Sequence, residues 1–141
     1  LKMSTVNMRP GKAQTFGIVE GTPVFGLPGN PAAAYIGFET LIRPALRKMQ
    51  GFTCFDRPRI SAKLSKDVKK KDPRRIYLRA TMVKDEAGDF IVTPDKNQSS
   101  GSFGVIQHST CLAIMPEGLE SKAAGDEVRC ILLDVPEEVV L

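Results

Sequence analysis

Apolar residues recur every three or four positions in one clear stretch of the chain, residues 30–50. Phe38, Leu41, Ala45 and Met49 follow this spacing, which predicts a helix with one buried face. Pro44 interrupts the pattern, because a proline inside a helix cannot donate the hydrogen bond that continues it. We therefore expect the helix to kink or to split into two pieces near residue 43, and to stop at Gly51.

The segment before this helix predicts short strands joined by tight turns. Residues 5–8, 15–19 and 24–27 read as extended segments, and the last two are expected to pair as a hairpin around residues 20–23. Asn30 is a suitable N-cap for the helix, and Pro31 falls at the first helical position, where proline is well tolerated.

From about residue 57 onward the hydrophobic period changes to two, which is typical of strands. Alternation at residues 60–64 and 76–82 is followed by apolar segments at 90–93, 111–115 and 128–133. The sequence therefore predicts an α+β fold in which a small, mainly antiparallel β-barrel or sheet follows the helical part. The change of pattern divides the chain into residues 1–53 and residues 54–141.

Composition places the chain among globular proteins, with 42% hydrophobic and 26% charged residues. No apolar run is long enough to cross a bilayer. Charge changes the picture more, because residues 1–84 carry 17 Lys and Arg against 5 Asp and Glu. Residues 85–141 carry 3 against 11. The basic part predicts an anionic partner if its cations converge, and a solvated surface if they do not.

Cysteine and histidine exclude several kinds of site. The three cysteines include no CxxC motif, so we do not expect a disulfide framework or a cysteine-type zinc site. We expect the protein to work in a reducing compartment. With one histidine, a two-histidine metal site cannot form within the chain.

Two turns in the basic part could bind an anion. Arg9 and Lys12 lie three residues apart across a proline–glycine turn, where both side chains could reach one anion. The loop at residues 26–31 joins a strand to the helix N-terminus, where free N–H groups favour anions. Both segments could equally be structural, the first as a basic surface hairpin and the second as a capped turn.

Two further segments carry polar groups of the same kind. Arg79 lies in the middle of a predicted strand, on the face opposite Leu78, and arginine is suited to bidentate recognition of oxyanions. The run Lys69–Lys71 is more consistent with a solvated loop. Residues 98–102 form a hydroxyl-rich turn that includes Ser100, and such turns are usually only loops.

Taken together, three of these strings resemble one family. The string N-M-R-P-G-K at residues 7–12, the string F-G-L-P-G-N-P at 25–31 and the string R-P-A-L at 43–46 are similar to the molybdopterin molybdenumtransferases, which include bacterial MoeA and the gephyrin E-domain. Weaker likeness continues at residues 74–79, 98–102 and 112–118, so the resemblance covers essentially the whole chain.

The resemblance implies an activity and its partners. The family joins molybdate to adenylylated molybdopterin and releases AMP, with a divalent cation such as Mg²⁺, in a cytoplasmic homodimer. Residues 1–53 would be the C-terminal part of a MogA-like α/β substrate-binding domain, and residues 54–141 would be the small β domain called domain IV. The Mg²⁺ ligands would lie upstream of this chain, so we expect the chain alone to be inactive, and neither nucleic acid nor a membrane is an expected partner.

The resemblance also implies roles for particular residues. Arg9 and Lys12 match the catalytic cations of a K-P-G-K motif, although Arg9 replaces the usual lysine. Arg79 and Ser100 match molybdate-binding residues of the β domain. The substrate-binding loop would consist of Pro28, Gly29, Asn30 and Pro31.

Two other functions remain open on the sequence alone. A small β domain with an exposed edge could act as a scaffold for protein partners, as gephyrin-like E-domains do, without any need for an anion. The basic half could bind nucleic acid, but that requires a contiguous cationic stripe, preferably with aromatic side chains. Aromatic residues make up only 6% of the chain.

Overall fold

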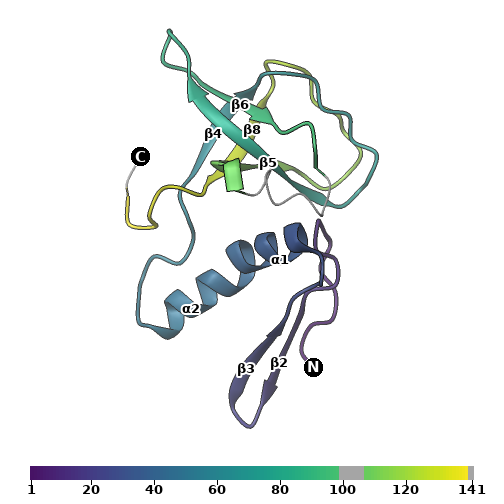
Figure 1. Ribbon diagram of the computed structural model, residues 1–141, viewed down its shortest axis with the longest axis vertical. Coiled ribbons are helices and arrows are strands. Elements are labelled where there is room, and N and C mark those ends of the chain that lie inside the picture. Colours follow the sequence, from purple (N-terminus) through teal and green to yellow (C-terminus); the bar gives the residue numbers. More distant parts are fainter. Residues whose placement is uncertain (99–106, 140–141) are drawn as a thin grey trace.

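The computed structural model describes residues 1–98 and 107–139. Near the N-terminus, β2 (Thr15–Val19) and β3 (Thr22–Gly26) pair in register as an antiparallel hairpin. Glu20 and Gly21 turn the chain with φ of 49° and 80°, the left-handed pair that suits a tight hairpin. The predicted hairpin is therefore confirmed, and it points away from the rest of the molecule (Figure 1).

The predicted helix is present, and it is divided where proline was expected to interrupt it. α1 (Pro31–Gly37) begins with proline and ends in a π-helical segment, η1 (Phe38–Ile42), after which α2 (Arg43–Met49) continues. Pro44 cannot donate to the preceding turn, and the wider π-turn accommodates the missing hydrogen bond. Gly51, with φ of 87°, follows the last turn as the expected stop.

The second part of the chain forms a closed barrel of five strands. Its members are β4 (Arg59–Leu64), β5 (Arg75–Lys84), β6 (Phe90–Pro94), β7 (Cys111–Met115) and β8 (Glu127–Leu132). They follow the order β5–β6–β4–β8–β7, and β7 pairs with β5 to close the ring. Every pair in the ring is antiparallel except β4–β6. The prediction of a barrel or sheet thus resolves as a barrel within a mixed α+β fold.

The barrel interior is one of two apolar cores that the described residues form. It is filled by small and medium side chains that alternate along the strands, among them Leu64, Ala80, Val92, Met115 and Cys130. All three cysteines are free thiols, and two of them, Cys111 and Cys130, are buried.

The second core lies on the outside of the barrel, where the helical part packs against it. Met8 and Ile36 contact the outward-facing side chains of β5, β7 and β8, including Tyr77, Leu112 and Ile114. In addition, β1 (Met8–Arg9) pairs in parallel with the start of β5. The alternation along β5 predicts that its outer face is exposed to solvent. In the structure, Met8 and Ile36 cover part of that face.

Ion pairs hold the same two parts together at the other end of the helix. Glu137 accepts from Arg43 at 2.5 Å and lies 3.3 Å from Arg47, and its carboxylate is 1% exposed. Arg57 donates to Glu39 at 2.7 Å. The segment after β8 is thus anchored to α2.

Candidate anion site

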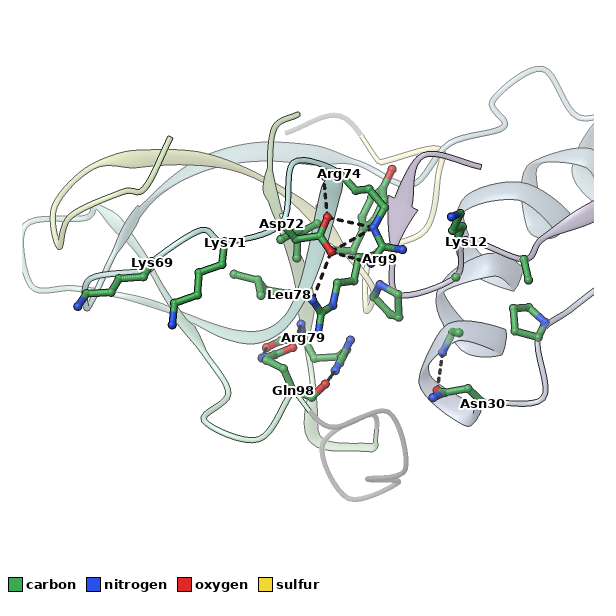
Figure 2. Close-up of a pocket in the computed structure, with 17 residues that line it drawn as sticks. Arg9, Lys12, Asn30, Lys69, Lys71, Asp72, Arg74, Leu78, Arg79 and Gln98 are labelled. Atoms are coloured by element: carbon green, nitrogen blue, oxygen red, sulfur yellow. Dashed lines mark hydrogen bonds and ion pairs between the residues drawn. The ribbon is translucent and has the colours of Figure 1, made fainter. Parts of the chain in front are cut away.

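A cavity of about 860 Å³ lies where the N-terminal turn, the start of α1 and the beginning of β5 meet (Figure 2). Its volume is within the range of about 300–1,000 Å³ that is usual for small-molecule sites. Six cationic side chains and one acidic side chain line it, namely Arg9, Lys12, Lys69, Lys71, Arg74, Arg79 and Asp72. The cations of the basic half therefore converge, which favours an anionic ligand over a merely solvated surface.

Asp72 organises two of these cations. Its carboxylate accepts from Arg74 at 2.6 Å and from Arg9 at 3.3 Å. The Arg74 side chain and backbone N–H hold the pKa of Asp72 well below its usual range, so this carboxyl stays ionised. Arg74 also reaches the carbonyl of Met8 at 3.5 Å. Asp72 therefore fixes the Arg9 turn against the strand that carries Arg79.

Arg79 is the most buried cation of the site, with 2% of its surface exposed. Gln98 bonds to both the backbone and the guanidinium of Arg79. The Gln98 side chain accepts from the Arg79 N–H at 3.1 Å and donates to the Arg79 carbonyl at 2.9 Å. The guanidinium Nη2 of Arg79 donates to the Gln98 carbonyl. Within the described residues, nothing accepts a hydrogen bond from the buried Nε of Arg79. Burial lowers the pKa of Arg79, although the charge of Asp95 acts in the opposite direction.

The loop before α1 reaches the opposite side of the cavity. Asn30 has extended φ and ψ and accepts from the Ala33 N–H at 3.2 Å, so it is the N-cap that the sequence predicts. Pro28 and Asn30 line the cavity. A Cβ added at Gly29 would meet no atom within 4 Å, so the backbone is open on that side.

Most of the predicted site residues therefore come together. Arg9, Lys12, Pro28, Asn30 and Arg79 all line one cavity, although they come from two distant stretches of the chain. Gly29 and Pro31 belong to the same loop without lining the cavity. The remaining predicted residue, Ser100, lies outside the described residues.

The structure adds residues that sequence reasoning missed. Asp72, Arg74 and Gln98 hold the site cations in place, and Lys69 and Lys71 extend its charge. The Asp-Pro-Arg string at residues 72–74 was a usable signal, because an aspartate before a turn often accepts from the backbone two residues later, as Asp72 does from the Arg74 N–H at 2.9 Å.

A resident metal ion does not fit the described part of this chain. Residues 1–98 and 107–139 contain no group of three or more His, Cys, Asp or Glu side chains able to hold a metal. In the site itself, the single carboxylate is already engaged by two arginines.

Comparison with known protein families identifies the chain's relatives. Residues 61–133, just over half of the chain, match the model of the MoeA C-terminal region, domain IV. The chain belongs to the MoeA family. Residues 2–48 match a second model, described as a probable molybdopterin binding domain. The resemblance found in the sequence strings is therefore confirmed.

Curated relatives and solved structures agree with this assignment. The molybdopterin molybdenumtransferases of Staphylococcus aureus (strain COL) and Staphylococcus epidermidis (strain RP62A) are 36% and 34% identical to it and cover 96% of the chain. MoeA from Pyrococcus horikoshii superposes on 93% of the chain with a TM-score of 0.76 at 27% identity. A molybdenum cofactor biosynthesis protein from Pyrococcus furiosus covers 93% of it with a TM-score of 0.72, also at 27% identity.

The chain spans only part of these proteins. It covers 33% of each staphylococcal relative, 31% of the Pyrococcus horikoshii structure and 45% of the Pyrococcus furiosus structure. Among the described residues, no helix is both long and apolar enough to span a membrane.

Proposed function

We propose that this MoeA-family chain supplies the cationic wall of a site that inserts molybdate into adenylylated molybdopterin, with release of AMP. The observation that carries the proposal is Arg79, a buried guanidinium at the wall of a cationic cavity whose Nε–H has no acceptor among residues 1–98 and 107–139. The relatives named molybdopterin molybdenumtransferase support the choice of molybdate, a tetrahedral dianion, as the ligand.

The chemistry we assign to the site is electrostatic. A guanidinium in a partly dehydrated wall interacts with an oxyanion more strongly than it would in water, and it is already oriented before the ligand arrives. Arg79 would hold the oxyanion, and Arg9 and Lys12 would neutralise charge that develops beside it. Ser100, which the resemblance assigns to molybdate, belongs to the same proposal as an additional hydrogen-bond donor.

Loop residues 28–31 complete the proposed site by shape rather than by charge. Asn30 uses its side-chain oxygen to cap α1, so the loop is held in one conformation beside the cations. Pro28 and Pro31 further restrict the backbone, and Gly29 leaves it open to a ligand. We propose that these four residues contact the pterin substrate.

The finer implications of the resemblance remain part of this proposal. They are a MogA-like origin for residues 1–53, a domain boundary at residues 53–54, a homodimer, and a cytoplasmic location. Mg²⁺ would have to be held by residues other than the described ones, so we derive no step through it. The scaffold alternative is not favoured, because the cations converge in a cavity and the relatives carry enzyme names.

Titration of sodium molybdate into the 141-residue chain tests the proposed ligand. We expect saturable binding of about one ion per chain, followed by calorimetry, that weakens as ionic strength rises because charged groups are being screened. Sulfate, a smaller tetrahedral dianion, serves as the competitor. Absence of saturable molybdate binding at low salt would overturn the proposal.

An activity assay separates binding from turnover. Supplied with adenylylated molybdopterin, molybdate and Mg²⁺, the chain should release no AMP above the enzyme-free rate, because it spans 33% of its staphylococcal relatives. A full-length relative assayed in parallel is the positive control. Release of AMP by the 141-residue chain at a comparable rate would show that the chain contains the complete machinery.

A further inference from the structure

Three consecutive lysines, Lys69, Lys70 and Lys71, adopt two different environments. Lys70 is 6% exposed, and its Nζ donates to the carbonyl of Arg74 at 2.7 Å and to the carbonyl of Gly118. In an extended chain, alternate side chains point to opposite sides. Capture of Lys70 therefore turns its two neighbours to the other side, where both line the cavity.

The backbone that carries these lysines is firmly held. Val68 and Lys122 exchange N–H···O bonds of 2.8 and 3.0 Å, and the Lys70 N–H donates to Ser121 Oγ at 2.9 Å. At the end of the run, the Gly118 N–H donates to the carbonyl of Pro73 at 2.8 Å. The segment is thus attached on both sides of the run, although Lys69 and Lys71 themselves are exposed, as the sequence suggests.

Lys69 and Lys71 lie at one end of the cavity and Lys12 and Asn30 at the other, with Arg79 between them (Figure 2). Within the described residues neither Lys69 nor Lys71 forms an ion pair. The nearby carboxylate of Asp72 is already bonded to Arg9 and Arg74. Both lysines therefore line the cavity without an ion-pair partner in the part of the chain that the structure describes.

The cavity is also larger and more cationic than one molybdate requires. A five-atom oxyanion fills only a small part of 860 Å³, given that a water molecule takes roughly 30 Å³. Six cations against one carboxylate leave positive charge unmatched after a single dianion has bound. Such an excess, spread over the length of the cavity, suits an extended ligand with more than one anionic group.

We propose that Lys69 and Lys71 form a second anion subsite, which binds a phosphate ester or phosphate anhydride group while molybdate occupies the middle of the cavity beside Arg9 and Arg79. This proposal rests on the proposed function and assigns the two lysines to the phosphate-bearing part of the pterin substrate. Lys70 acts as a positioning residue, because its Nζ donates to the backbone carbonyls of Arg74 and Gly118 and so fixes the direction of its neighbours.

Inorganic pyrophosphate and molybdate are the probes that test the two subsites. The test variant is Lys69→Gln/Lys71→Gln. The matched control is Lys2→Gln/Lys48→Gln, which removes the same charge from exposed positions outside the cavity. Both ligands are titrated by calorimetry, separately and with the other ligand at saturation.

We expect pyrophosphate to bind molybdate-saturated protein, and the Lys69→Gln/Lys71→Gln variant to bind pyrophosphate about tenfold more weakly. Its affinity for molybdate should stay within about twofold of the parent, and the control variant should match the parent for both ligands. Equal loss of pyrophosphate affinity in both double variants, or one-for-one displacement of pyrophosphate by molybdate, would overturn the second subsite. Failure of the parent chain to bind molybdate at all would instead contradict the proposed function.

Discussion

Replacing Arg79 by methionine is expected to weaken molybdate binding about a hundredfold and to leave the ligand-free protein at least as stable as the parent. Arg79 is buried, burial lowers its pKa, and among the described residues nothing accepts a hydrogen bond from its Nε or forms an ion pair with it. Replacing such a group by an apolar side chain of similar length is often neutral or stabilising. Loss of a buried charged partner costs about 3 kcal/mol in binding, which corresponds to roughly a hundredfold in affinity.

Thermal unfolding with and without molybdate measures both effects. The parent should unfold at a higher temperature with molybdate present, and Arg79→Met should show no such shift. Arg75→Met is the matched control, because Arg75 lies on the same face of β5 but lines a different, smaller cavity. A large drop in the stability of ligand-free Arg79→Met would mean that the guanidinium is structural. Equal loss of binding in both variants would mean that overall charge, rather than position, matters.

The helix illustrates how far the sequence determines local structure. Asn30, Pro31, Pro44 and Gly51 each act on the backbone within one turn of their own position, and all four expectations hold in the structure. The positions of the strands can be predicted from period-two alternation, because that pattern is also local. The pairing of the strands cannot, because alternation shows which face is apolar and does not show which strand lies alongside.

The outer face of β5 shows what alternation cannot supply. Arg75, Tyr77 and Arg79 occupy positions that a half-exposed strand would leave in solvent, yet Tyr77 is 9% exposed and Arg79 is 2% exposed. Met8 and Ile36 pack against Tyr77, and they come from a part of the chain about 40 to 70 residues earlier in sequence, whereas Gln98, 19 residues later, bonds to Arg79. Burial of Arg79, which makes it a strong candidate for oxyanion binding, is therefore a tertiary effect.

The residues of the candidate site likewise fall into those that local sequence marks and those whose roles depend on tertiary contacts. Arg9, Lys12 and Arg79 could be predicted, because the family strings mark them. The local turn of Asp72 with Arg74 could be predicted too, but the bond from Arg9 to Asp72 across 63 positions of sequence and the place of Lys69 in the cavity could not, since both depend on distance in space. A run of like charges also gives no sign that its middle member is buried.

The second large effect that we expect is a loss of stability when the contact between α2 and the C-terminal segment is broken. Replacing Glu137 by glutamine is expected to lower the free energy of unfolding by about 3 kcal/mol at pH 7, because it leaves Arg43 and Arg47 without the buried carboxylate between them. Glu138→Gln is the matched control: Glu138 is 54% exposed and pairs only with Arg47, so its loss should cost less than about 1 kcal/mol. Urea unfolding of the three proteins measures the difference.

The effect of Glu137→Gln on the free energy of unfolding should depend on pH, which the effect of a packing defect would not. The hydrogen bond from Arg43 lowers the pKa of Glu137 in the folded protein, relative to about 4.3 in the unfolded chain. The carboxylate therefore contributes its full stability above about pH 5 and loses it as pH falls through the lower folded value. The gap between parent and Glu137→Gln should be constant from pH 6 to 8 and should shrink below pH 5. If the difference in unfolding free energy stayed the same at pH 3, the effect would come from packing. The ion pair would then not be what joins the barrel to the helix.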